Sequence, residues 1–284
     1  MISVCTVISG SGTEYIPKFL KSLSENCHFV NEVVICYFEQ EYAKRCLSWG
    51  PAGLKNWDGI TNSFKETEQE MYGLKVKKFH IPRIGYGAGV SFEHSIGLYN
   101  CIPRTENDYI LFSDPDVIVL SDIDRLYLDL MKDHNLHFVG ISHYNSPETQ
   151  PYMFMPTVIN MLTHKKHMPD NKFLYGKPTD FGHPRKVHVC GNWLIPGQTP
   201  EYNNEFPFPE SQSWDAGNKL HLHCKWNNKR WLSFATKDEH NYDTSVFHSN
   251  CELNLDLPLQ KLLYHEGSSS FKEPQNTGFM KDFV

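Results

Sequence analysis

The sequence of 284 residues lacks a surplus of positive charge and any internal repeat. Lysine and arginine number 27 against 33 aspartate and glutamate residues, so the formal net charge is −6. General binding of nucleic acid is therefore not expected, because no excess of cations is available to neutralise a phosphate backbone. The absence of a repeat excludes solenoid and array architectures. Hydrophobic residues make up 40% of the chain, enough to fill the core of one large domain or two small ones.

Long apolar runs are also missing. No segment approaches the roughly 20 apolar residues that a bilayer-spanning helix needs. Residues 1–7 lack the basic start and the long apolar core of a secretion signal. The eight cysteines are scattered, without a CxxC pair. We therefore expect no transmembrane segment, a cytoplasmic location and reduced thiols, although the even cysteine count leaves disulfides open.

Short apolar runs alternate with helical patterns in the first part of the chain. Residues 2–8 and 33–37 predict buried strands, and the run 109–112 is typical of a strand buried on both faces of a parallel sheet. Between them, helical spacing connects the apolar residues Ile16, Phe19, Leu20 and Leu23, and residues 90–100 also predict a helix. This alternation predicts an α/β fold with a mostly parallel sheet flanked by helices.

The second part of the chain is less regular. Residues 122–130 predict a helix and residues 137–141 a strand, but residues 144–186 show no sustained period. Long irregular segments in compact domains are usually functional loops or lids. We expect a single domain over residues 1–284, whose regular and irregular halves meet near residue 120 without a linker.

The most informative motif is Asp114-Pro115-Asp116, which lies between two apolar runs. Carboxylates two positions apart in extended backbone project from the same face, and Pro115 ends regular strand pairing. Ligands bind open α/β sheets at the carboxyl ends of such strands. Two neighbouring carboxylates there favour Mg²⁺ or Mn²⁺, which in turn hold phosphates. The alternative interpretation is an Asp-Pro-Asp turn that caps a helix.

With these residues in place, the chain resembles GT-A glycosyltransferases, especially the inverting, family 2-like branch. The resemblance covers residues 2 to about 270 and depends on the order of its motifs. These are the strand-loop-helix start, an acid at the end of the second strand, the Gly89-x-Ser91-x-x-His94-x-x-Gly97-Leu98 stretch, the Asp-x-Asp pair, the glycine-led run 191–195, Trp214-Asp215-Ala216-Gly217 and the His265-Glu266-Gly267 segment.

The resemblance implies a GT-A fold, a nucleoside-diphosphate sugar donor and a glycan or other hydroxyl acceptor. Residues 1–120 would form the half that binds the nucleotide sugar, and residues 121–284 the acceptor-binding and catalytic half. Mn²⁺ or Mg²⁺ would lie across the diphosphate. The implied roles are donor contacts for Ser9 and Glu39, metal ligation for Asp114, Asp116 and His265, with Asp114 also in the donor site, and general-base catalysis for Asp215.

Several alternatives stay open at this level. Arg83 is a candidate contact of the diphosphate or a solvated arginine, and His94 a donor contact or a core histidine. Asp215 also suits a helix N-cap, and His240 and His248 rival His265 as the third metal ligand. The whole chain has two rival interpretations: a nucleotidyltransferase acting on sugar phosphates, and a sugar- or nucleotide-binding module without turnover.

Overall fold

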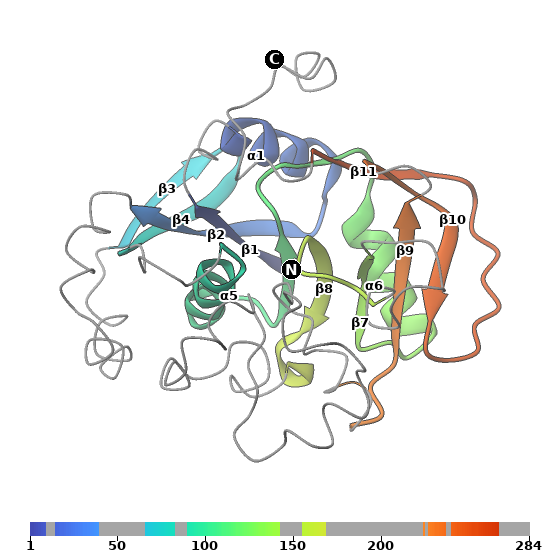
Figure 1. Ribbon diagram of the computed structural model, residues 1–284. Coiled ribbons are helices and arrows are strands. Elements are labelled where there is room, and N and C mark those ends of the chain that lie inside the picture. Colours follow the sequence, from blue (N-terminus) through green and yellow to red (C-terminus); the bar gives the residue numbers. More distant parts are fainter. Residues whose placement is uncertain are drawn as a thin grey trace.

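The computed structural model describes residues 1–9, 15–39, 66–82, 90–142, 155–168, 224, 227–236 and 240–266. Its strands are β1 (Ile2–Ser9), β2 (Val30–Glu39), β3 (Glu66–Met71), β4 (Leu74–Pro82), β5 (Tyr109–Ser113), β6 (Val117–Val119), β7 (Phe138–Ile141), β8 (Asn160–His164), β9 (Trp231–Thr236), β10 (Asn241–Ser249) and β11 (Lys261–His265). These described strands form an 11-stranded sheet in the order β3-β4-β2-β1-β5-β8-β7-β9-β10-β11-β6 (Figure 1).

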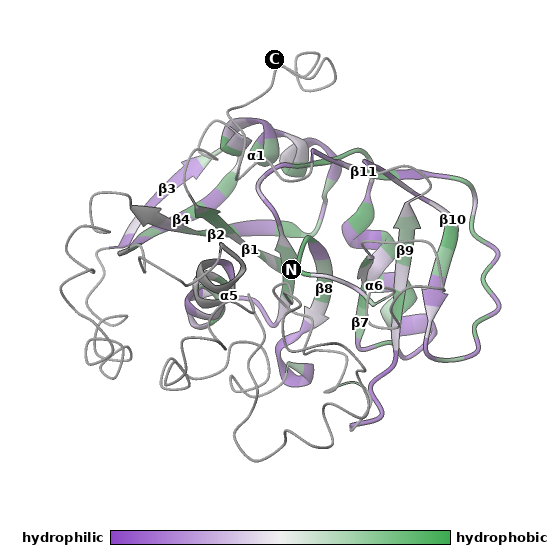
Figure 2. Ribbon diagram, in the orientation of Figure 1, coloured by the Kyte–Doolittle hydropathy of each residue, from purple (hydrophilic) through white to green (hydrophobic). Residues whose placement is uncertain are grey.

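The predicted parallel core is confirmed. Strands β4, β2, β1 and β5 lie next to one another and run parallel. Within β2, Val33 and Val34 are both fully buried although their side chains point to opposite faces, as expected of a sheet covered on both sides. Antiparallel β3 closes the outer edge with five exposed residues, and Figure 2 shows how hydrophilic it is beside the central strands. A polar edge strand of this kind discourages pairing with other chains.

Helices cover both faces of the parallel core. The described α-helices are α1 (Tyr15–Asn26), α5 (Val90–Cys101) and α6 (Ile123–Asp133), as the sequence predicts, and short 3₁₀ helices follow at η3 (Ile102–Arg104) and η5 (Lys165–His167). Alternate residues of β1 separate two cores: Val4 packs in the core that contains the buried residues of α1 and α6, whereas Cys5 packs in the core that contains Leu98 of α5. The predicted apolar face of α1 is buried in the first core.

The remaining strands form a mixed extension that curves back toward β5. Strands β8, β7, β9, β10, β11 and β6 follow β5 in the sheet, with antiparallel pairs except for β7 and β9. Only Asp114, Pro115 and Asp116 separate β5 from β6 along the chain. Because so few residues span little more than ten ångströms, the last strand of the sheet must return to the carboxyl end of β5.

Two further expectations concern the membrane and the thiols. None of the described helices is long and apolar enough to span a membrane. The six cysteines within the described residues are free thiols, and five of them are buried. Cys46 and Cys190 lie outside the described residues.

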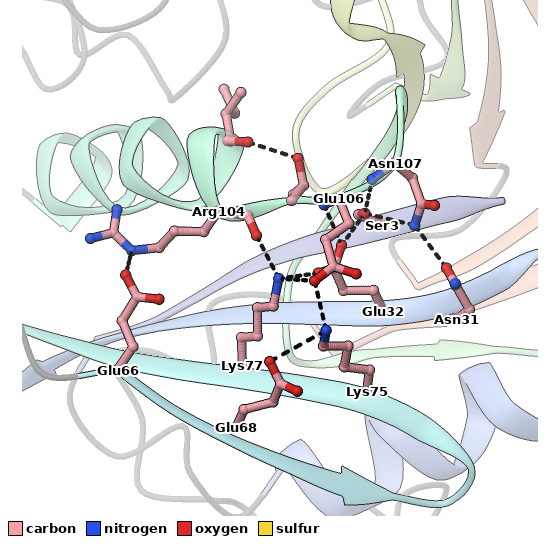
Figure 3. A network of polar contacts seen from close by, with 12 residues as sticks. Ser3, Asn31, Glu32, Glu66, Glu68, Lys75, Lys77, Arg104, Glu106 and Asn107 are labelled. Carbon is pink, nitrogen blue, oxygen red and sulfur yellow. Dashed lines mark hydrogen bonds and ion pairs between the residues drawn. The ribbon is translucent and has the colours of Figure 1, made fainter.

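A polar network joins the amino ends of the parallel strands (Figure 3). Glu32 of β2 has a side chain only 1% exposed, and its Oε1 lies 2.7 Å from the ammonium group of Lys77 on β4. Its other oxygen accepts hydrogen bonds from the Ser3 hydroxyl and, at 2.9 Å, from the Glu106 backbone N–H. Lys77 also lies 2.9 Å from the Glu106 carboxylate. The buried charge of Glu32 is thus matched by one cation and two hydrogen-bond donors.

Replacing Glu32 should therefore destabilise the fold. We expect Glu32→Gln to lower the free energy of unfolding by about 3 kcal/mol, because it leaves Lys77 largely buried without its main counter-charge. Urea denaturation measures the change. The matched control is Glu68→Gln, whose exposed carboxylate lies 3.4 Å from Lys75 and should contribute less than about 1 kcal/mol. Equal effects of the two substitutions would contradict a structural role for the buried pair.

Candidate metal centre

The two aspartates lie on the short connection between β5 and β6, at the carboxyl edge of the parallel core. The Asp114 N–H donates to the Ile159 carbonyl at 2.9 Å, and the Asp114 carbonyl accepts from Val117 N–H at 3.3 Å. The Asp116 carbonyl accepts from Glu266 N–H at 3.2 Å. Backbone hydrogen bonds therefore hold both ends of the connection. The side chain of Asp116 is 6% exposed and that of Asp114 is 19% exposed.

Strand β11 delivers His265 to this connection. It pairs antiparallel with β6 so that His265 lies opposite Val117, one residue beyond Asp116. Both backbone groups of His265 are held by His240: the His265 N–H donates to the His240 carbonyl, and the His265 carbonyl lies 2.9 Å from Nδ1 of His240. The imidazole is buried, with its side chain 10% exposed. The position of His265 is thus set by strand register.

The side chains of Asp114, Asp116 and His265 lie close together, and we call these three residues the metal group. One ligand atom from each residue lies within 4.8 Å of the others. Nε2 of His265 is 3.5 Å from Oδ1 of Asp116 and 3.9 Å from Oδ2 of Asp114. A cation beside two neighbouring carboxylates would offset their mutual repulsion. Carboxylate oxygens and one imidazole nitrogen suit a divalent metal ion such as Mn²⁺, so these residues could hold a metal.

A second histidine lies beside the same aspartate. His94 of α5 places Nε2 3.3 Å from Oδ1 of Asp114, and its side chain is 17% exposed. The two histidines thus contact opposite oxygens of one carboxylate. The structure places His94 beside the metal group; sequence patterns left it as a donor contact or a core histidine. No pattern in the sequence between His94 on α5 and Asp114 after β5 predicts this contact.

The other predicted site residues are less completely described. Ser9 and Glu39 end strands β1 and β2, and these parallel strands end at the same edge of the sheet as β5. Nothing further is described of their side chains, and Arg83 and Asp215 lie outside the described residues.

The rival histidines have different positions. His248 lies on β10 opposite Ser233 of β9, and burial lowers the pKa of its imidazole. His240 contacts the backbone of His265. Among the described residues, the possible metal group contains His265 and neither of its rivals.

No family model matches this chain, and no curated protein matches it. Among solved structures, S. aureus TarS 1–349 in complex with UDP has a TM-score of 0.37 and 14% identity, covering 66% of this chain and 55% of that one. The glycosyltransferase GlyE of Streptococcus pneumoniae TIGR4 has a TM-score of 0.36 and 16% identity, covering 83% of this chain and 45% of that one.

Mouse xyloside xylosyltransferase 1 is similar over more of its own length. It has a TM-score of 0.39 and 11% identity, covering 81% of this chain and 83% of that one. By contrast, this chain spans little more than half of TarS 1–349. Because all three TM-scores and identities are low, a function can be inferred only from the residues of the site itself.

The metal group leads to a direct binding test. We expect Asp116→Asn to weaken Mn²⁺ binding by about 100-fold or more, since losing a residue that merely supports a ligand already costs 10–100-fold. His265→Ala should weaken it by at least about tenfold for the same reason. Isothermal titration with Mn²⁺ measures both. The control is His248→Ala, which should leave the affinity unchanged; a larger loss in His248→Ala than in His265→Ala would move the ligand to β10.

Proposed function

We propose that this chain is a metal-dependent glycosyltransferase. It transfers a sugar from a nucleoside-diphosphate sugar to a hydroxyl of a glycan or another acceptor, with inversion by single displacement. The observation that carries the proposal is the group of Asp114, Asp116 and His265 at the carboxyl edge of a parallel sheet. Open α/β sheets bind their ligands at this edge, and a carboxylate-held divalent cation is the usual partner of a diphosphate.

A bound Mn²⁺ or Mg²⁺ would offset the negative charge that grows on the departing diphosphate. The chain's own residues prepare this position. Asp114 and Asp116 supply the oxygen ligands, and His265 adds a nitrogen ligand from the opposite strand. His94 lies against the second oxygen of Asp114, so it orients that carboxylate in the way that outer partners orient metal ligands.

The donor and the acceptor occupy the two halves of a single domain. Residues 1–120 form the half that binds the nucleotide sugar. In this proposal Ser9 and Glu39, which end the first two strands, contact the nucleoside, and Arg83, which follows β4 in the sequence, binds the diphosphate. Residues 121–284 form the half that binds the acceptor. Asp215 removes the proton of the acceptor hydroxyl as its oxygen attacks the anomeric carbon from the face opposite the diphosphate.

Turnover of the donor tests this function. With Mn²⁺ present, one donor from a panel of UDP-, GDP-, CDP- and dTDP-sugars should release its nucleoside diphosphate. The release should be slow when water is the acceptor and faster once a hydroxyl acceptor is added. Asp116→Asn should abolish the release because it removes a metal ligand. The release is measured with a coupled diphosphate assay. Binding without release for every donor would identify a binding module. Formation of a nucleoside-diphosphate sugar and inorganic pyrophosphate from a nucleoside triphosphate and a sugar phosphate would identify a nucleotidyltransferase.

The base assignment has its own test. We expect Asp215→Asn to retain the affinity for the donor and to lose transfer by about 100-fold or more, as general-base catalysis typically contributes 10²–10⁴-fold. Separate measurements of donor Kd and kcat distinguish the two effects. The control is Asp129→Asn on the exposed side of α6, which should behave as the wild type. Full activity of Asp215→Asn would return this residue to the role of a helix cap.

A further inference from the structure

A group of three histidines lies at the opposite edge of the sheet from the metal group. His137 precedes β7, His164 ends β8 and His167 ends η5. The ring of His167 contacts the other two, with centroids 4.4 Å from that of His137 and 5.9 Å from that of His164. We call these three residues the histidine cluster.

The strand register separates the histidine cluster from the metal group. His164 pairs with Tyr109 at the start of β5, whereas Asn160 pairs with Ser113, next to Asp114, at its end. The length of β5 therefore lies between them, about 13 Å at the usual rise of an extended strand. The histidine cluster cannot belong to the site proposed for the metal and the donor.

Hydrogen bonds fix the tautomers of two rings in the cluster. Nδ1 of His137 accepts from the Arg230 backbone N–H at 2.9 Å, and Nδ1 of His164 accepts from the Lys166 backbone N–H at 3.1 Å. A ring nitrogen that accepts carries no proton, so each neutral ring must carry its proton on Nε2. Nε2 is then a donor and not a metal ligand, which makes the pair suited to an anion and unsuited to a cation.

Cationic residues are close in the chain to two of the same rings, since Lys165 and Lys166 lie between His164 and His167; Lys229 and Arg230 directly precede β9. Burial and, next, the charge of Lys229 lower the pKa of His137, a backbone hydrogen bond with Arg230 acts against them, and the charges of Arg230 and Lys166 add to the lowering. Burial and the charges of Lys166 and Lys165 also lower the pKa of His164, and the charge of Asp108 acts against them. Burial, the other two histidines, Lys229 and Lys166 lower the pKa of His167 to about 4.

The balance of charge here differs from that of the whole chain. Lys165, Lys166, Lys229 and Arg230 each lower the pKa of at least one ring of the cluster, whereas Asp108 raises that of His164. The chain as a whole has a formal net charge of −6. Concentrated cations within an acidic chain create a local potential that attracts anions.

We propose that the histidine cluster, with Lys166 and Lys229, is a binding site for a phosphate group. The Nε2–H groups of His137 and His164 and the two ammonium groups are all donors, and a phosphate dianion offers oxygens to several donors at once. This site takes a second anionic group, distinct from the donor diphosphate, from a soluble phosphate ester or from a phospholipid headgroup. It does not depend on the metal group or on the proposed transfer.

Titration of the full chain with inorganic phosphate in EDTA tests the proposal, because EDTA removes metal-supported binding at Asp114 and Asp116. We expect phosphate to raise the NMR-measured pKa of His167 by about 1 pH unit, since an opposite charge favours the imidazolium form. His167→Gln assigns the signal. The double substitution Lys166→Met and Lys229→Met should weaken phosphate binding by about tenfold or more. The control is Lys132→Met, which replaces an exposed residue of α6 and should leave the affinity for phosphate unchanged.

The pH dependence gives a second readout. Sulfate keeps its charge between about pH 5 and pH 8, so any change in its affinity reports the protein. Binding that raises a histidine pKa takes up protons, and sulfate should therefore bind more tightly as the pH falls.

Binding to vesicles of phosphatidylcholine with phosphatidic acid, but not without it, identifies a lipid headgroup; binding of inorganic phosphate alone identifies a soluble ligand. An unchanged pKa of His167, or equal phosphate affinity in the double variant and the wild type, would overturn the proposal.

Discussion

The antiparallel pairing of β11 with β6 is the interaction on which the candidate site depends. It brings His265 next to the connection that carries Asp114 and Asp116, and it returns the last strand of the described sheet to the end of β5. A shift of one residue in this register would turn His265 to the other face of the sheet, because side chains alternate along a strand. The metal group therefore exists only when the whole second half of the sheet is assembled.

The two edges of the parallel core treat buried carboxylates differently. At the amino edge, Glu32 has a permanent counter-charge in Lys77 of the same chain (Figure 3). At the carboxyl edge, Asp114 and Asp116 have His94 and His265 as neighbours among the described residues. In the first arrangement, the charge of the carboxylate is neutralised within the chain, which stabilises the fold. The second brings two carboxylates and an imidazole close together, an arrangement that could hold a divalent cation.

Sequence patterns predict the local part of this structure well. The periodicity of residues 16–23 identifies the buried face of α1, and the apolar runs identify β1, β2 and β5. Asp114 and Asp116 are recognisable as a pair because they are neighbours in the chain. His265 is suggested only by resemblance, and His94 only as one of two alternatives, a donor contact or a core histidine, without its direct contact with Asp114. Both depend on register and on helix packing between distant segments, which single-sequence periodicity does not contain.

The most direct measurement is a thermal-melt comparison of the wild-type chain with UDP, GDP, CDP, ADP and dTDP, each with Mn²⁺, with Mg²⁺ and with EDTA. A ligand at about 100 times its dissociation constant stabilises the folded state by about 2.7 kcal/mol, which raises Tm by a few degrees in a chain of this size. The account predicts that one nucleotide raises Tm with a divalent cation and that EDTA abolishes the rise. A rise that persists in EDTA, or no rise with any nucleotide and metal, would contradict a metal-held diphosphate site at Asp114, Asp116 and His265.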